Sequence, residues 1–283
     1  MLGLAVANDA ETFERMRGPL AERGIRAEHV SVREHVTRLE DPPFDSANFD
    51  AGFVFPGRLM EGGVVDAFLD VPWVNDRAAV LRSRNKAGAL ATLADAGVPV
   101  PETVYVSNPA DEDDVRAAFA AFDPPVVVKP NSTTRGVGVT KIHDADSLDG
   151  VTDYLELVHD YRATGDKSYL VQEFLPDAAD YRVMVLDGEV VGAVQRTAPD
   201  GWKHNVHRGA DAAGVALPDD LEKLAVDAAD ALDVPFLGVD LLVSGDRAVV
   251  SETNARPTID SEEKYDAGFY DRLAALVERT ADR

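Results

Sequence analysis

The chain has no cysteine among its 283 residues. This absence excludes disulfide bonds, thiolate metal sites and a cysteine nucleophile. Long apolar runs are also missing, because no stretch approaches the ~20 residues that a helix needs to cross a bilayer. The beginning, MLGLAVANDAETFERM, lacks the basic residues of a signal peptide. Together these absences predict a cytoplasmic protein that does not act in a membrane.

Positive charge is scarce as well, since 28 lysines and arginines face 51 aspartates and glutamates, for a formal net charge of -23. Such a chain is not expected to bind nucleic acid, whose phosphates need clustered lysine and arginine. The acids are dispersed, as in DPPFDSANFD and NPADEDDV, rather than gathered in a tail. This pattern resembles that of haloarchaeal proteins, which stay soluble where concentrated salt shortens the Debye length to about 3 Å. An ordinary acidic protein is the alternative, and most carboxylates are expected to be on the surface.

Alternating strand and helix patterns predict an α/β fold in three units: residues 1–76, 77–168 and 169–283. The length favours several domains, with a working site in a cleft between them. Strand-like runs are LGLAVAN, IRAEHVSV, AGFVFP, VPWVN, VPVPETVYV, PPVVVKP and YLVQEFL; helical patterns lie after the first run, at 85–97, and near 111–122, 147–162 and 267–281.

The stretch VVVKPNSTTRGVGV, residues 126–139, places Lys129 at the end of a buried strand, just before a loop rich in hydroxyl groups and glycine. The hydroxyls and backbone N–H groups of such a loop can fold over phosphates. The loop differs from a Walker A loop, because its lysine precedes the glycines and no Gly-Lys-Ser/Thr closes it. The stretch predicts a phosphate-binding lid, with a plain turn beside a solvated lysine as the alternative.

Two hairpins are predicted in the last third of the chain. In YRVMVLDGEVVGAVQR, Asp187 and Gly188 are typical of a type I′ turn. In FLGVDLLVSGDRAVVSETN, oxygen-bearing side chains lie near one end, at Asp240, Glu252 and Asn254.

The loop of the second hairpin decides whether these three side chains meet. Glu252 and Asn254 share a face, because side chains alternate along a strand. An odd loop such as residues 245–247 sets Asp240 opposite Glu252, whereas a two-residue turn moves Glu252 to the other face. We expect the odd loop, and with it a site for Mg²⁺, or alternatively Mn²⁺, shared with substrate phosphates. Solvent-facing charge in an acidic chain is the other interpretation, which the flanking apolar runs disfavour.

Six motifs follow one another in the order KP with STTRGVGV, LVQEFL, DYRVMV with DGEVVGAVQR, NVHRG, GVDLL and ETNARP. In this order they resemble an ATP-grasp ligase of the RimK type over roughly residues 76–262. The resemblance implies a three-domain α/β ATP-grasp architecture, with a Rossmann-like N-terminal domain and nucleotide bound between two sheets. It also implies an enzyme that uses ATP and Mg²⁺ to join a small-molecule carboxylate to an amine, for example to glutamate.

The resemblance also implies roles for single residues. Asp240, Glu252 and Asn254 match the metal ligands. Residues that match nucleotide contacts are Lys86, Lys129, the loop residues Thr134, Gly136 and Gly138, the adenine segment Glu173, Phe174 and Leu175, then Asp180 and Lys203. Residues that match positions near the substrate or the transferred phosphoryl group are Arg182, Arg196, Asn205, Arg208 and Arg256, while nearby His207 is expected to be structural.

Two departures from the family pattern bear on the site. The chain reads NARPT where the family commonly has a small residue, proline and glycine after Asn-Ala. Arg256 is therefore expected close to the metal ligands. This departure puts the family's usual substrate in doubt. Arg196 falls on the face opposite Arg182 in the register of a type I′ hairpin, unless a β-bulge intervenes.

The implied reaction is acyl activation, in which a carboxylate attacks the γ-phosphoryl group of ATP and an amine then displaces phosphate from the acyl phosphate. Positioning and charge neutralisation matter more in such a reaction than a general base. A phosphotransferase acting on a hydroxyl group is an alternative. A nucleotide-binding protein without catalysis is another, which the intact metal ligands disfavour. A homo-oligomer is left open.

Overall fold

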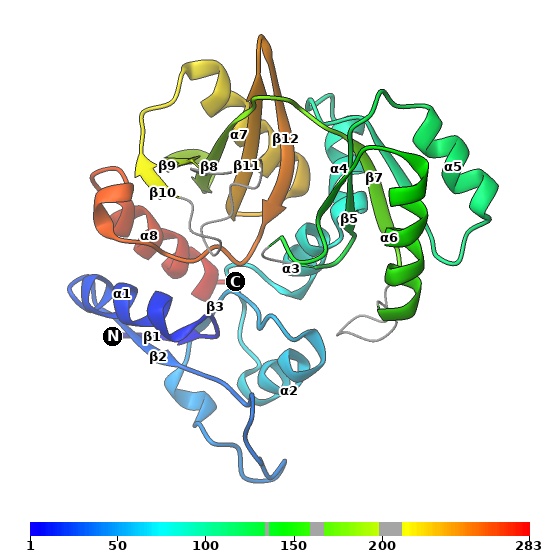
Figure 1. Cartoon of the computed structure of the whole chain (residues 1–283). Helices are drawn as coiled ribbons and strands as arrows, with labels where there is room; N and C mark the ends of the chain where they lie inside the picture. The colour runs from blue at the N-terminus through cyan, green and yellow to red at the C-terminus, as the bar shows by residue number, and fades with distance from the viewer. Residues whose placement is uncertain (134–135, 159–166, 198–210) are drawn as a thin grey trace.

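The computed structural model describes residues 1–133, 136–158, 167–197 and 211–283. The described strands form sheets of three, four and five strands. Figure 1 shows the three-stranded sheet at the bottom, the four-stranded sheet with its helices on the right and the five-stranded sheet at the top. This arrangement confirms the predicted mixed α/β fold. Among the described helices, none is long and apolar enough to span a membrane.

The N-terminal sheet is parallel, with the order β2-β1-β3. The apolar strand β1 continues into helix α1, where the Asp9 side chain accepts a hydrogen bond from the backbone N–H of Thr12 at 2.9 Å. The predicted strand VPWVN contributes only an isolated bridge between Trp73 and Gly52. The elements of this unit are β1 (Leu2–Val6), α1 (Ala10–Ala21), β2 (Ile25–His29), the 3-10 helix η1 (Ser46–Asn48), β3 (Ala51–Phe53) and α2 (Leu59–Leu69).

The central sheet is antiparallel, with the order β4-β7-β5-β6. Val126 and Val128 of β5 point into a core shared with α5 and α6. Lys129 follows Val128, so its side chain points to the opposite face of the sheet. Strand β7 lies between β4 and β5, so this sheet continues past the unit boundary expected at residue 168. Its elements are β4 (Thr103–Val106), α5 (Glu112–Ala120), β5 (Val126–Pro130), β6 (Thr140–Ile142), α6 (Ala145–Val158) and β7 (Tyr169–Glu173).

The five-stranded sheet is antiparallel, with the order β10-β9-β8-β11-β12. Helices α3, α4 and α7 pack against it, so the helical segment expected to belong to the central unit shares the core of this sheet instead. The elements are α3 (Arg77–Arg84), α4 (Lys86–Asp95), β8 (Ala179–Leu186), β9 (Glu189–Thr197), β10 (Asp211–Gly214), α7 (Asp219–Leu232), β11 (Phe236–Ser244), β12 (Arg247–Asn254), the 3-10 helix η3 (Glu262–Lys264) and α8 (Phe269–Ala281).

The hairpin β8-β9 turns as predicted. Asp187 and Gly188 have φ values of 55° and 78°, the left-handed pair that a type I′ turn requires. A β-bulge then shifts the pairing of the two strands, so that Arg196 lies opposite Asp180. Arg196 therefore shares a face with Arg182, which resolves the register problem raised by the turn type.

The prediction of an odd loop between β11 and β12 is wrong. Ser244 pairs with Arg247, so the turn has two residues, with Gly245 at φ 58°. Asp240 nevertheless lies opposite Glu252, because a β-bulge shifts the register between Asp240 and Leu241. The expected side-chain arrangement is thus reached by a bulge instead of by the loop.

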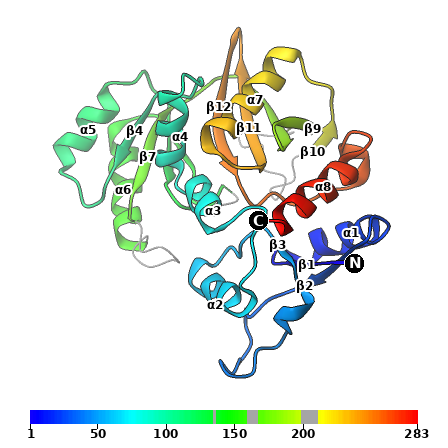
Figure 2. The same cartoon turned by 180° about the vertical axis from the view of Figure 1, so that it is seen from behind.

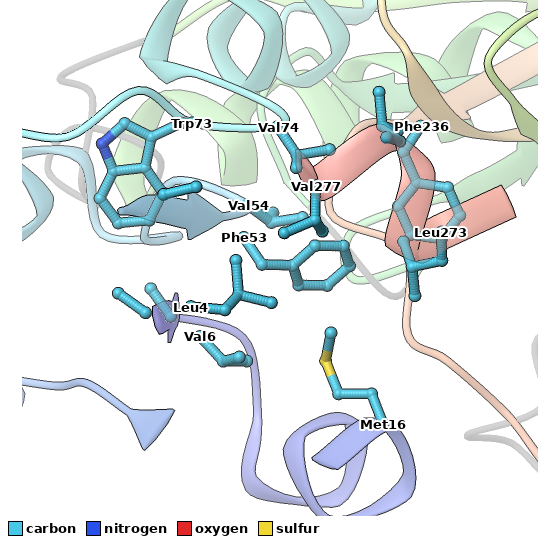
Figure 3. Packing of buried hydrophobic residues seen from close by; sticks show 14 of the residues in the cluster. Leu4, Val6, Met16, Phe53, Val54, Trp73, Val74, Phe236, Leu273 and Val277 are labelled. Atoms are coloured by element: carbon cyan, nitrogen blue, oxygen red, sulfur yellow. The ribbon is translucent and has the colours of Figure 1, made fainter. Parts of the chain in front are cut away.

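One apolar cluster joins the N-terminal sheet to the rest of the molecule (Figure 3). Phe53 of β3 packs against Phe236 of β11, with ring centroids 5.8 Å apart, and Leu273 of the C-terminal helix α8 lies in the same cluster. Figure 2 shows α8 beside β1 and α1, although it is the last helix of the chain. Buried Asn75 adds polar contacts, because its amide donates hydrogen bonds to the carbonyls of Phe236 at 2.6 Å and Ala255 at 2.7 Å. The N-terminal and C-terminal units therefore share one apolar core, whereas the central sheet packs on a separate cluster with α5 and α6.

Candidate active site

Few charged side chains of the described residues are buried. They are Lys86, Lys129, Asp180 and Asp240, each less than a tenth exposed. All four were predicted from the sequence as site residues. Because burying a charge without partners is costly, a cluster of such groups in an otherwise surface-charged protein marks a candidate active site.

Lys129 connects the two larger sheets. Its Nζ reaches from β5 of the central sheet to the carbonyl of Ser251 on β12, at 3.2 Å. Burial lowers the pKa of Lys129 to about 8; the negative charges of Glu252 and Asp240 oppose this shift and the positive charge of Lys86 adds to it. A buried ammonium with a lowered pKa is stabilised by an anion brought beside it.

Lys86, the first residue of α4, faces the same space. Its Nζ lies 3.2 Å from Oε1 of Glu252 and donates a hydrogen bond to the carbonyl of Thr133 at the start of the glycine loop. Asn131 holds this helix start in place, because its Oδ1 accepts from Ala87 N–H at 2.8 Å and its Nδ2 donates to Asn85 Oδ1 at 2.9 Å. The loop, α4 and β12 therefore converge on one ammonium group.

Arginines and aspartates form a second cluster on the face of the five-stranded sheet. Arg182 holds both oxygens of Asp240, through Nε on Oδ1 and through Nη2 on Oδ2 at 2.8 Å. Arg196 reaches Oδ2 of Asp240 at 3.2 Å and Oδ1 of Asp180 at 2.5 Å. Burial alone would raise the pKa of Asp240, but the charges of Arg182 and Arg196 outweigh it and lower that pKa to about 2. Asp240 is therefore a carboxylate at any physiological pH.

The three predicted metal ligands lie on the last residues of β12 and on the part of β11 that pairs with them. Asp240 faces Glu252 across the ladder, and Asn254 Oδ1 accepts a hydrogen bond from the backbone N–H of Arg256 at 2.9 Å. Within the described ranges, no three His, Cys, Asp or Glu side chains gather around one point. Two carboxylates and an amide oxygen still suit a hard cation that takes its other ligands from phosphates. Asp240 would have to share its oxygens with the ion or release Arg182.

The segment predicted to contact adenine, Glu173 to Leu175, connects the two larger sheets at the end of β7. The Glu173 carboxylate accepts hydrogen bonds from Arg247 of β12, at 2.6 and 2.7 Å, and from the backbone N–H of Glu102 at 2.6 Å. Although partial burial opposes it, these hydrogen bonds hold the pKa of Glu173 below its usual value. The Lys141 ammonium lies 4.3 Å from the centroid of the Phe174 ring. The contact between the two larger sheets thus lies next to Phe174 in the chain.

The glycine loop has the backbone that its sequence indicates. Gly136 and Gly138 have φ values of 65° and 78°, and a Cβ at Gly138 would lie 2.7 Å from Cγ of Pro130. Thr133 closes the loop by donating from Oγ1 to the carbonyl of Val137 at 3.0 Å. The predicted site residues Thr134, Lys203, Asn205 and Arg208, with His207, lie outside the described residues.

Arg256 lies next to the metal ligands in the chain, but its side chain points away from them. Its guanidinium donates to the carbonyls of Ala7, Val54 and Phe55 in the N-terminal unit. Burial lowers the pKa of Arg256 to about 10, and the charge of Arg84 adds to this shift. The prediction of a cation close to the metal ligands therefore holds for the backbone of Arg256, not for its charge.

Sequence reasoning missed several polar residues that position this site. Asn131 and Asn85 fix the start of α4, and Ser83 Oγ accepts from the backbone N–H of Ala255 at 2.9 Å. Asn85 directly before a helical pattern is a typical N-cap signal, which would have pointed to it. Asn131 and Ser83 act through contacts between distant segments, for which the sequence holds no local signal.

Comparisons with known proteins give a consistent result. A family model described as RimK-like ATP-grasp domain matches residues 83–269. A protein named probable alpha-L-glutamate ligase from Stenotrophomonas maltophilia (strain K279a) is 34% identical over 192 residues, which are 67% of this chain and 63% of that protein. One of the same name from Thioalkalivibrio sulfidiphilus is 34% identical over 212 residues, 74% of this chain and 67% of that protein. The match to the Stenotrophomonas protein spans less than two thirds of its length, and these relatives give no support to a haloarchaeal origin.

Solved structures share the fold over the whole chain. The D-alanine--D-alanine ligase of Bacillus anthracis, complexed with ATP, superposes with a TM-score of 0.74 at 15% identity, covering 100% of this chain and 98% of that one. A RimK domain ATP-grasp protein from Sphaerobacter thermophilus gives a TM-score of 0.71 at 22% identity, with the same coverage of 100% and 98%. At such identities the likeness shows the ATP-grasp fold alone.

Proposed function

Because the chain belongs to the RimK-like ATP-grasp family, we propose that it is an ATP-dependent carboxylate-amine ligase. The substrates would be a carboxylate-bearing small molecule and an amino acid such as glutamate, because these relatives are named probable alpha-L-glutamate ligase. The observation that carries the proposal is the pair of buried lysines, Lys86 and Lys129, next to the facing carboxylates Asp240 and Glu252. This arrangement suits a polyphosphate bound between the sheets.

The proposed chemistry proceeds through an acyl phosphate. A carboxylate oxygen attacks the γ-phosphorus of ATP, the bond to the β,γ-bridging oxygen breaks, and ADP leaves. The amine nitrogen then attacks the acyl carbon, the carbon to phosphate-oxygen bond breaks, and the nitrogen loses a proton. Lys86 and Lys129 neutralise the phosphates, and Lys129 binds them best when it is charged.

A divalent cation such as Mg²⁺ would be held by Asp240, Glu252 and Asn254. Bound there, it would withdraw charge from the phosphate oxygens. Arg182 would then be free to turn from Asp240 toward the transferred phosphoryl group, while Arg196 keeps its contact with Asp180. The adenine would lie beside Phe174, against the junction held by Glu173 and Arg247.

The proposal is tested by screening amino acids against small carboxylic acids for release of ADP, with mass spectrometry of the product. We expect ADP, phosphate and an amide in equal amounts. Lys129→Met should abolish ADP release. Its matched control Lys223→Met should retain ADP release, because Lys223 is an exposed lysine of α7 that pairs with Asp227. ADP release with a phosphorylated product and no free phosphate would show a phosphotransferase instead. No ADP release with any pair would contradict catalysis.

A further inference from the structure

Two half-buried arginines meet where α3, the end of β12 and the N-terminal unit come together. Arg84 is the last residue of α3, and Arg256 follows β12. Between them, Ser83 Oγ accepts from the backbone N–H of Ala255 at 2.9 Å and lies 3.2 Å from Thr253 Oγ1. These contacts hold the two chain segments together, so Arg84 and Arg256 are neighbours whose charges act on each other.

Neither arginine forms an ion pair with any residue in the described ranges, and Arg84 has no side-chain hydrogen bond there either. Arg256 donates to backbone carbonyls and to Asn8 Oδ1, which satisfy its N–H groups but carry no net charge. The carboxylate whose charge acts on Arg256 is Asp9, which is exposed and caps α1.

This lack of partners is unusual in a chain with 51 acids and 28 lysines and arginines. The arginines of the active site, Arg182 and Arg196, each hold an aspartate. Two neighbouring cations that are partly removed from water repel each other. The oxygens that accept from Arg256 replace part of its hydration but do not neutralise its charge, which an anion would do. The pair is therefore incomplete in the protein alone.

The pair also lies where a substrate would enter. The carbonyls that Arg256 contacts follow β1 and β3, at the carboxyl edge of the parallel sheet, which is the edge at which α/β sheets bind ligands. On the other side, the Arg256 backbone donates to Asn254, a proposed metal ligand. The arginines thus stand between the edge of the N-terminal sheet and the reaction centre.

We propose that Arg84 and Arg256 bind a second carboxylate of a substrate, one that takes no part in the reaction. The inference rests on the proposed ligase function and narrows its substrates to molecules with such a group. The carboxylate belongs either to a dicarboxylic acceptor or to the amino acid that supplies the amine, and a guanidinium pair suits its planar oxygens in both cases.

Isothermal titration calorimetry can test this without turnover. The probes are succinate, glutarate and adipate, each compared with the monocarboxylate of equal carbon number, and L-norvaline compared with butylamine. We expect at least one dicarboxylate, or L-norvaline, to bind about tenfold more tightly than the compound that lacks its extra carboxylate. The reason is that this carboxylate gains charge-assisted hydrogen bonds from the arginines. Arg84→Gln should remove most of this advantage.

The matched control is Arg82→Gln, because Arg82 lies on the same helix but is exposed and donates to the Leu232 carbonyl. It should keep the wild-type preference. Loss of a dicarboxylate preference in Arg84→Gln assigns the group to the acceptor, and loss of the norvaline preference assigns it to the amine.

Equal binding within every pair of probes, or equal effects of the Arg84 and Arg82 substitutions, overturns the inference. Unchanged thermal unfolding of Arg84→Gln shows that a binding loss is not a loss of fold. Since the titration needs no ATP hydrolysis, the two failures can be told apart: carboxylate binding without any ADP release would contradict the ligase function, while the carboxylate site at Arg84 and Arg256 would remain.

Discussion

Lys129 is the residue at which pH should act most directly. Its pKa of about 8 means that about nine tenths of the molecules carry this charge at pH 7 and about one tenth at pH 9. The charged form binds phosphate, so ATP affinity should fall about tenfold between these pH values. Calorimetric titration with ATP at each pH, without amine, measures this change.

The control for this prediction is Lys129→Arg, which keeps a positive charge at both pH values. Its affinity for ATP should be lower than that of the wild type but nearly independent of pH. A wild-type affinity that is constant from pH 7 to pH 9 would show that Lys129 is charged throughout or does not contact the nucleotide.

The two carboxylates of the proposed metal site should respond differently to loss of their charge. Glu252→Gln removes a metal ligand that also pairs with Lys86, at a side chain 36% exposed. We expect turnover to fall by roughly a hundredfold or more. The loss of stability should be smaller than for a fully buried pair, because solvent reaches the Glu252 end of the contact with Lys86. Near-normal turnover at saturating Mg²⁺ would remove Glu252 from the site.

Asp240→Asn should abolish turnover too, but with a larger loss of stability. The substitution leaves Arg182 and Arg196 without the charge that both contact, and breaking a buried ion pair in this way costs about 3–5 kcal/mol. Denaturant unfolding of the two variants side by side separates the effects. Equal stability of Asp240→Asn and the wild type would mean that the arginines find other partners.

At the level of elements, two β-bulges decide which side chains meet. The bulge opposite Met184 and Val185 brings Arg196 onto the face of Asp180, and the bulge near Asp240 brings Glu252 opposite it. Turn sequences predict the register next to the turn, where the hairpin at Asp187 behaved as expected. A bulge further along the strand depends on packing against other elements. The sequence analysis could therefore name a bulge only as a condition for Arg196, and it did not foresee the one near Asp240.

The glycine loop should act as a lid over the transferred phosphoryl group. Gly138→Ala introduces a Cβ that meets Pro130 at 2.7 Å, at a φ of 78° that L residues rarely adopt. The loop should then close poorly and admit water to the acyl phosphate. The ratio of phosphate released to amide formed should rise relative to the wild type.

Gly150→Ala is the matched control for the lid, because a Cβ at this position of α6 would meet no atom within 4 Å other than those of the adjacent backbone of its own helix. Its ratio of phosphate to amide should equal that of the wild type. An unchanged ratio in Gly138→Ala would show that the loop does not protect the intermediate.

At the level of the whole molecule, the mixed α/β fold could be predicted, because strands such as β1, β5 and β7 have their own runs of apolar residues. The apolar core that the N-terminal sheet shares with the last helix could not be predicted from the sequence. Leu273 in the last helix completes the core of the N-terminal sheet, and Asn75 bonds to Phe236 and Ala255, more than 150 positions away. Such contacts depend on tertiary packing, which leaves no periodic signal in the chain.

The distribution of charge over the whole molecule predicts a dependence on salt. Asp180 and Asp240 are the buried acids of the described chain, so the other described carboxylates lie at or near the surface, as in the first turns of α5 and α7. With a net charge of -23, these groups repel one another once the Debye length grows from about 3 Å in molar salt to about 30 Å in 0.01 M salt. The melting temperature should therefore fall steeply when molar KCl is replaced by dilute buffer.

Sucrose at equal osmolality is the control for the effect of salt. It should not restore the melting temperature, because an uncharged solute leaves the repulsion between carboxylates unscreened. A melting temperature that is constant across this range would contradict the interpretation of the acidic surface as an adaptation to salt.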